Sequence, residues 1–293
     1  MRTGFIGVAL ATLALALALA ATATGAPSVA SQTGSCAKEN LRLVQPGKLT
    51  LATDNPAFPP WWGGGETRPP WKVSNPYSGQ GYESAVAYAV ARELGFRKGE
   101  VEWRHVPFAQ SFRPGKKNFD WYMAQVSYTP ERDRQVDFSN AYYYVNQALV
   151  ARKGTPIARA RSIAALRPYR LGAQLGTTSY EYIVDHIRPS SRPLAFRTND
   201  LAIQALKNGQ IDGIVVDLPT AFYVTAVQVE DGVIVGQFPN RGGTRERFGM
   251  VFEQGNPLRR CVNRALNRLW ANGTIKALQN RWLARVGGAP VLR

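Results

Sequence analysis

The sequence predicts an α/β protein in which strands and helices alternate, with sheets that are mostly parallel. Segment 48–53 (KLTLAT) alternates between polar and apolar side chains as a strand does. Segment 82–95 then carries apolar residues at helical spacing and stops at a glycine. This change of period recurs along the chain, which is typical of helices packed on a sheet. With 45% hydrophobic and 19% charged residues, the chain can bury a core.

The later elements follow the same alternation. Asp54 to Gln80 is predicted to be a long loop, because it is rich in proline and glycine, and it also holds Trp61, Trp62 and Trp71. Thr129 and Pro130 favour a helix start as N-cap and first helical residue. We expect further strands at 101–106, 148–152, 169–175 and 211–217, and helices at 162–169, 179–187, 201–209, 256–270 and 274–283.

Residues 1–30 are predicted to be an export signal. Arg2 is followed by an uncharged run from Gly7 to Ala21, and small residues come next. The alternative is a retained membrane anchor, but the run is about 15 residues long and a bilayer span needs about 20. We therefore expect a soluble, extracytoplasmic protein. About 260 residues remain after processing, which suits one large or two medium domains.

The charge and the cysteines narrow the choice of partners. The net charge is +16, but the basic residues are scattered and form no run, so no nucleic-acid partner is expected. Cys36 and Cys261 are the two cysteines, and outside the cytoplasm they favour a disulfide. Lipidation of Cys36 is the alternative, although Cys36 lies far beyond the apolar run. The sequence offers no metal-ligand pattern and no cofactor fingerprint, so neither a metal nor a cofactor is expected.

Three segments carry groups that complement a zwitterion. Arg132 falls on the third position of the helix that follows Thr129, where its planar guanidinium can pair with a carboxylate. Gly176-Thr177-Thr178 ends a strand and presents helix N–H groups and a hydroxyl to a small anion. Asp217 ends an apolar strand and can receive an ammonium. Together these groups suit the backbone of an α-amino acid.

The chain resembles the amino-acid-binding proteins of ABC importers, the family-3 extracellular solute-binding proteins, from Lys48 to Leu283. The motifs, in family order, are ATDNPAFPPW, GYES, VSYTPER with VDFS and YY, LGAQLGTTSY, NGQIDGIVVD, and NG-x-I-x-AL-x2-RWL. The resemblance implies a two-lobed periplasmic-binding-protein (flytrap) fold with two crossing hinge strands. Lobe 1 would comprise 31–149 plus 237–293, and lobe 2 would comprise 150–236.

The resemblance also implies roles for individual residues. Arg132, aided by Thr178, would clamp the ligand α-carboxylate, while Ser127 and Asp217 would hold the α-ammonium. The ligand side chain would be covered by Phe58, with Asp54 and Trp61 nearby. Glu83-Ser84 departs from the family's usual acid position, Ala124-Gln125 alters one pocket wall at Gln125, and the loop from Trp62 to Gln80 is longer than typical. These departures leave the side-chain preference open.

The predicted function is capture of a free amino acid and its delivery to the membrane permease of an ABC importer, by a protein that is a monomer and not an enzyme. One alternative is a dehydratase of small cyclic acids on the same scaffold, with Glu181 as its acid. Another is a sensing module, for which the sequence shows no fused kinase or membrane segment.

Overall fold

A computed structural model describes residues 1, 4, 36–240, 245–283 and 288–293. The chain divides into two compact units, Met1–Gly34 and Ser35–Arg293, and every element below belongs to the second. The predicted export signal lies almost entirely outside the described residues. Within the described ranges, no helix is both long enough and apolar enough to cross a bilayer.

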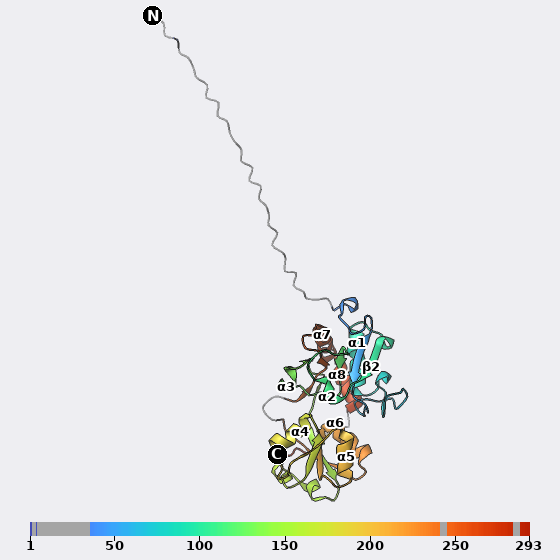
Figure 1. Cartoon of the computed structure of the whole chain (residues 1–293), viewed down its shortest axis with the longest axis vertical. Helices are drawn as coiled ribbons and strands as arrows, with labels where there is room; N and C mark the ends of the chain where they lie inside the picture. Colours follow the sequence, from blue (N-terminus) through green and yellow to red (C-terminus); the bar gives the residue numbers. More distant parts are fainter. Residues whose placement is uncertain (2–3, 5–35, 241–244, 284–287) are drawn as a thin grey trace. The chain divides into compact units, whose positions relative to one another are not determined.

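The first sheet has the strand order β2 (Val101–His105), β1 (Leu49–Thr53), β3 (Trp121–Tyr122), β12 (Val251–Phe252) and β4 (Asp137–Phe138). Its main core includes residues of the helices α1 (Tyr82–Glu93), α7 (Leu258–Ala271) and α8 (Thr274–Leu283), and Figure 1 shows α1 beside β2. Gly81 precedes α1 at φ 87°, and a Cβ there would lie 2.5 Å from the Trp61 carbonyl oxygen. Only glycine therefore fits where α1 meets the loop 54–80, which we call the tryptophan loop because it carries Trp61, Trp62 and Trp71.

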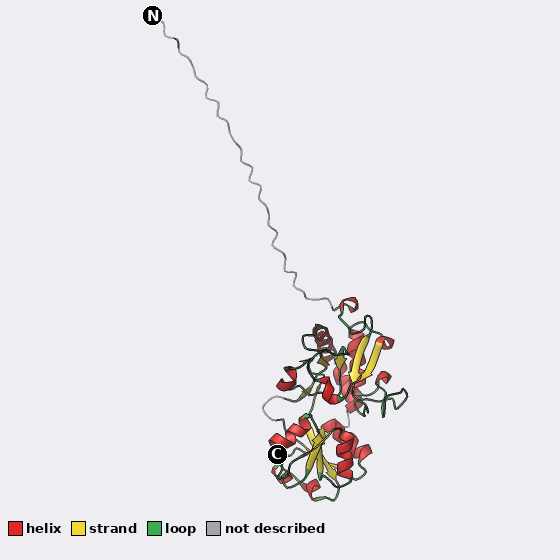
Figure 2. Cartoon of the chain, in the orientation of Figure 1, coloured by secondary structure: helices red, strands yellow, loops and turns green. Residues whose placement is uncertain are grey.

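The second sheet has the order β10 (Gly232–Gln237), β6 (Gln147–Arg152), β9 (Gly213–Asp217), β7 (Leu171–Gln174) and β8 (Leu194–Phe196). Helices α4 (Thr178–Tyr182), α5 (Asn199–Lys207) and α6 (Leu218–Tyr223) flank it, and Figure 2 shows its strands between helices. Along β6, Leu149 joins one hydrophobic core and Val150 joins another. Both faces of this sheet are therefore buried, as its apolar strands require.

Both sheets are mixed rather than mostly parallel as predicted. β1 runs parallel to β2 and β3, and β7 runs parallel to β8 and β9. β12 is antiparallel to β3 and β4, and β6 is antiparallel to β9 and β10. The reversed strands lie next to the places where the chain passes from one sheet to the other. The direction of such a strand is set by the connection that precedes it. The pattern of apolar residues within a strand is the same in either direction, so the sequence could not predict it.

Two segments cross between the sheets. One follows β5 (Tyr143–Tyr144) and the other precedes β11 (Arg247–Phe248), and β5 and β11 pair antiparallel. Asn146 joins these segments, because its Nδ2 donates to Gln237 Oε1 at 2.8 Å and its Oδ1 accepts from Asn240 Nδ2 at 2.9 Å. The predicted two-lobed fold with crossing strands is therefore confirmed.

The lobe boundaries differ from expectation at the C-terminus. Val291 forms a bridge with Gln237 of β10, and Leu292 is buried in a core of the second sheet. We therefore assign 288–293 to the second lobe rather than to the first. The apolar side chain of Leu292 packs in a core whose other residues lie far from it in the sequence. Hydrophobic periodicity is a local signal and cannot predict such a contact.

The remaining elements are short. They are α2 (Phe108–Ser111) and α3 (Pro130–Asp133), the 3-10 helices Lys38–Asn40, Pro76–Ser78, Lys98–Glu100, Pro156–Arg159 and Ala164–Leu166, and the π-helical turns Ile183–Ile187 and Val224–Gln228. The helix expected at 162–169 is thus a single 3-10 turn, and Pro168 follows directly after Arg167, its C-cap. The predicted Cys36–Cys261 disulfide is present, with its Cα atoms 5.5 Å apart, and ties the start of the second unit to α7.

Candidate functional site

The two lobes line one cavity, at the carboxyl ends of β1, β7 and β9, where α/β sheets place ligands. Seven of the eight predicted ligand-binding residues lie there. They are Asp54, Phe58, Gln125, Ser127, Arg132, Thr178 and Asp217. Further lining residues, which were not among the eight predicted binding residues, include Trp62, Phe108, Gln174, Ser179, Asn199 and Asp200.

Trp61 is the exception, because it does not line this cavity. The residue is 1% exposed, and its ring packs edge-on against Tyr143 and Phe248. Its indole Nε1 donates to Thr220 Oγ1 at 3.1 Å. The neighbouring Trp62 lines the cavity instead. The sequence cannot show which of two adjacent tryptophans faces a ligand, because that depends on how their loop packs on α1.

Arg132 is fixed from both sides of the cavity. Thr129 caps α3 and accepts a hydrogen bond from the Arg132 backbone at 3.2 Å. The guanidinium donates to the Ser127 carbonyl at 2.6 Å and to the Gly176 carbonyl at 2.7 Å, and it lies over Phe112. Burial lowers the pKa of this side chain from its ordinary value. A guanidinium has five N–H donors, so these two bonds leave donors for a carboxylate.

Thr178 begins α4 on the opposite lobe. Thr177 precedes it as N-cap and accepts from the Tyr180 backbone at 3.2 Å, after Gly176 has turned the chain at φ 76°. The backbone N–H of Thr178 belongs to the first helical turn, whose N–H groups have no intrahelical acceptor. This arrangement can receive an anion beside Arg132.

Asp217 ends β9 and lies at the N-cap position of α6, but its side chain makes no capping bond there. It accepts instead from Gln147 Nε2 at 2.7 Å. Burial, followed by the negative charge of Glu246, raises the pKa of Asp217 well above its usual range. The charged form of Asp217 is therefore stabilised by a cation that binds beside it.

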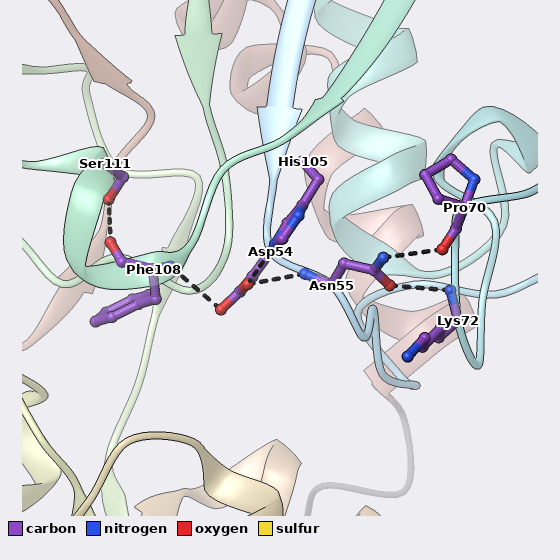
Figure 3. A network of polar contacts seen from close by, with 7 residues as sticks. All are labelled: Asp54, Asn55, Pro70, Lys72, His105, Phe108 and Ser111. Carbon is purple, nitrogen blue, oxygen red and sulfur yellow. Dashed lines mark hydrogen bonds and ion pairs between the residues drawn. The ribbon is translucent and has the colours of Figure 1, made fainter.

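Two further carboxylates line the cavity. Asp54 accepts from the backbone N–H of Asn55 at 2.8 Å and of Phe108 at 3.2 Å, and it lies 3.4 Å from His105 Nε2 (Figure 3). Burial raises the pKa of Asp54 despite these donors. Asp200, on the first turn of α5 after the Thr198 cap, also has a pKa raised by burial. The sequence had marked Asp54 by its motif, whereas Asp200 and His105 were missed.

Glu83 supports one wall of the cavity from beneath. It is completely buried and accepts from the Gln125 backbone at 2.7 Å, from the Gln125 side chain and from the Tyr142 hydroxyl. Gln125 has the left-handed φ of 52°, which this bonding stabilises. Burial raises the pKa of Glu83 to about 7. Glu83 and Gln125 are therefore joined directly by hydrogen bonds.

Glu246 was also missed by the sequence, since no local pattern surrounds it. It precedes β11 on the second crossing segment and lines a second cavity together with Gln147, Thr178, Glu181, Tyr182, Asp185, His186, Phe238, Pro239 and Asn240. Its carboxylate accepts from the hydroxyls of Ser127 and Thr178, each at 2.6 Å. Among the described residues, no group of three or more His, Cys, Asp or Glu side chains could hold a metal ion.

Comparison with known proteins identifies the family. The arginine-binding extracellular protein ArtP of Bacillus subtilis is 25% identical over 209 residues, which cover 69% of this chain and 77% of that protein. The ABC transporter arginine-binding protein 1 of Escherichia coli is 27% identical, covering 69% of this chain and 81% of that one.

A solved ancestral arginine-binding protein bound to glutamine aligns with a TM-score of 0.65 at 29% identity, covering 81% of this chain and 98% of that one. An ancestral amino-acid-binding protein described as a precursor of cyclohexadienyl dehydratase has a TM-score of 0.65 at 27% identity, with coverage of 80% and 95%. Residues 62–285 match the bacterial extracellular solute-binding proteins, family 3, and the chain belongs to that family.

Proposed function

We propose that this protein binds a free amino acid in the first cavity, outside the cytoplasm, and delivers it to the membrane permease of an ABC importer. The observation that carries the proposal is the placement of Arg132 and Asp217 on the walls of one cavity. A guanidinium suits the α-carboxylate and a carboxylate suits the α-ammonium. An analogue that lacks either charge would leave a desolvated partner unpaired, which is costly.

The same cavity favours a ligand with a cationic side chain. After Asp217 has been matched with the α-ammonium, the carboxylates of Asp54 and Asp200 still line the cavity. Burial raises the pKa of both side chains because it disfavours their charged forms. A nearby positive charge on the ligand would stabilise those charged forms. Two of the relatives are named as arginine-binding proteins, which supports this preference. We therefore propose arginine, lysine or a similar amino acid as the ligand.

Binding would be coupled to closure of the lobes. Arg132 belongs to the first lobe and donates to Gly176 of the second, and Ser127 Oγ lies 3.3 Å from Thr178 Oγ1 across the same gap. A ligand that touches both lobes gains contacts in the closed state that the open state lacks, and so shifts the population toward closure.

Calorimetry with the twenty common L-amino acids tests this proposal, with arginine and lysine expected to bind most tightly. Arg132→Ala should weaken binding about 30- to 5000-fold, since truncating one member of a buried charge pair costs about 2–5 kcal/mol. Arg134→Ala is the matched control, because Arg134 is exposed and pairs with Glu131 at 3.8 Å on the surface. Absence of binding by every amino acid, or unchanged affinity in Arg132→Ala, would contradict the proposal.

The dehydratase alternative has one supporting observation, the likeness to the ancestral precursor of cyclohexadienyl dehydratase. Its candidate acid, Glu181, lines the second cavity rather than the first. Glu181 is therefore not placed over a ligand held by Arg132 and Asp217. Incubation with a prephenate-like substrate tests the alternative, and we expect no turnover.

A further inference from the structure

The carboxylate of Glu246 gathers hydrogen bonds from both lobes. Oε1 accepts from Ser127 Oγ of the first lobe and from Thr178 Oγ1 of the second, each at 2.6 Å. Gln147 Nε2 lies 3.1 Å from each of the two carboxylate oxygens. Glu246 lines the second cavity and not the first, Ser127 lines the first, and Thr178 lines both. Glu246 thus lies behind the two hydroxyls rather than in front of them.

These contacts determine which way the hydroxyl protons point. A hydroxyl carries one proton and two lone pairs, and a carboxylate can only accept. The protons of Ser127 and Thr178 therefore both point to Glu246. Thr178 Oγ1 also accepts from Gln147 Nε2 at 3.5 Å, so each hydroxyl keeps at least one lone pair for the first cavity. The two hydroxyl oxygens are 3.3 Å apart, and neither has a second proton to offer the other.

Gln147 connects Glu246 to Asp217 by hydrogen bonds. Its Nε2 donates to Asp217 Oδ1 at 2.7 Å as well as to Glu246, and its Oε1 accepts from Ser179 Oγ at 2.6 Å. The amide orientation is thereby fixed, with its N–H donors directed at the two carboxylates and, at the longer distance of 3.5 Å, at Thr178 Oγ1. The wall made by Ser127, Thr178 and Asp217 consequently offers acceptors to whatever lies in the first cavity.

We propose that Glu246 is a positioning residue that makes this wall accept hydrogen bonds only, and so selects a protonated α-amine over an α-hydroxyl. This inference rests on the proposed function. An α-ammonium carries three donors, which three acceptors can receive. An α-hydroxyl carries one donor, so its own lone pairs would face those of the wall, and unmatched buried acceptors are costly. The α-carboxylate is then left to Arg132 and to the backbone N–H of Thr178.

The probes are the tightest-binding L-amino acid of the panel and the 2-hydroxy acid with the same side chain. Glu246→Gln retains the size of the side chain but offers one neutral acceptor oxygen in place of a charged carboxylate. The two wall hydroxyls are then held less firmly and can turn their protons toward the first cavity. Affinity for the amino acid should fall about tenfold, while affinity for the hydroxy acid should change less. The preference between the two probes should therefore narrow about fivefold or more.

Glu181→Gln is the matched control, because Glu181 lines the same second cavity and its charge also acts on Arg132. It should leave the preference within about twofold of the wild type. Glu246→Asp, which restores a carboxylate, should recover part of the preference. Equal losses for both probes in Glu246→Gln, or the same narrowing in Glu181→Gln, would overturn the inference.

If Glu246→Gln does not fold, Ser127→Ala provides a second test, because it removes one acceptor from the wall. The preference for the amine should again narrow, and an unchanged preference would overturn the inference. Failure of the wild type to bind any amino acid would contradict the proposed function itself. Normal binding with an unchanged preference in both variants would contradict only the role of Glu246.

Discussion

Asp54 and Asp217 line the same cavity but differ in how many donors they already have. Asp54 accepts from two backbone N–H groups and lies beside His105, whereas Asp217 receives a hydrogen bond from Gln147. Burial is the largest cause of the raised pKa in both, and at Asp217 the charge of Glu246 raises it further. Asp217 is therefore the carboxylate that gains most from a ligand ammonium.

Asp217→Asn should weaken amino-acid binding at least about tenfold while leaving the melting temperature of the unliganded protein unchanged or slightly higher. The amide oxygen can still accept from Gln147, and the repulsion between Asp217 and Glu246 is removed. Calorimetry and thermal unfolding on this one variant check both effects. A lower melting temperature with full affinity would mean that Asp217 serves mainly to end β9 and begin α6.

Glu83 should make the stability of the protein depend on pH. Burial raises its pKa from 4.5 to about 7, so between these values the folded state holds a proton that the unfolded state has lost. The unfolding free energy should therefore fall as pH rises through this window, by up to about 3 kcal/mol from this group.

Glu83→Gln cannot titrate and is the comparison for this prediction. The difference in unfolding free energy between the wild type and the variant should shift between pH 5 and pH 8, with the wild type losing stability relative to the variant. Denaturant unfolding at both pH values measures it. A difference that stays constant with pH would exclude Glu83 as the source.

At the scale of elements, short segments do most of the positioning. α3 is four residues long, yet its Thr129 cap and the two carbonyl acceptors of Arg132 hold the guanidinium in the cavity. Asn146 on the first crossing segment similarly bonds to Gln237 and Asn240, where the second segment leaves β10. Precision here comes from hydrogen bonds at the ends of elements rather than from long helices.

The Cys36–Cys261 disulfide should stabilise the protein without affecting ligand binding. It closes a loop of 225 residues and joins the N-terminal segment to α7. A double Cys36→Ser, Cys261→Ser variant should lose about 3–5 kcal/mol of unfolding free energy in the entropic account. Neither cysteine lines the first cavity, so the affinity should stay within about twofold. A large loss of affinity would indicate that α7 and the cavity are coupled.

At the scale of the whole molecule, several contacts join the lobes directly. Besides the contacts of Arg132 and Glu246, Trp61 Nε1 of the first lobe donates to Thr220 Oγ1 of α6 at 3.1 Å, and Phe58 lies 6.2 Å from Tyr223 between ring centroids. These contacts connect the tryptophan loop to the helix that follows Asp217. Closure around a ligand and packing of the loop are thus linked.

Thr220→Val should weaken ligand binding about fivefold, because it leaves the buried Trp61 N–H without its acceptor in the closed state, at a cost of about 1 kcal/mol or more. In an open state the indole could meet water instead. Thr225→Val is the control, since Thr225 bonds to the Ala221 carbonyl of its own helical segment at 3.0 Å. Equal affinity with a reduced melting temperature would mean that the Trp61–Thr220 bond persists when the lobes open.

The sequence by itself determined the order of the elements, the disulfide partners and seven of the residues that line the first cavity. Helix and strand periods, the Thr129 cap and the apolar run before Asp217 are local signals, and each is readable within about ten residues. Only two cysteines were present to pair. Arg132, Thr178 and Asp217 could be marked because each stands at the end of a predictable element.

The tertiary structure alone decided the strand directions, the place of the C-terminal tail, the choice of Trp62 over Trp61, and the roles of Glu83, Asp200 and Glu246. Glu246 and Ser127 are 119 positions apart, and Glu83 and Gln125 are 42 apart. Such contacts depend on how two lobes and a loop pack against one another. A buried carboxylate is stabilised by hydrogen-bond donors from segments that are distant in sequence. No local sequence pattern predicts that these segments lie close together in the fold.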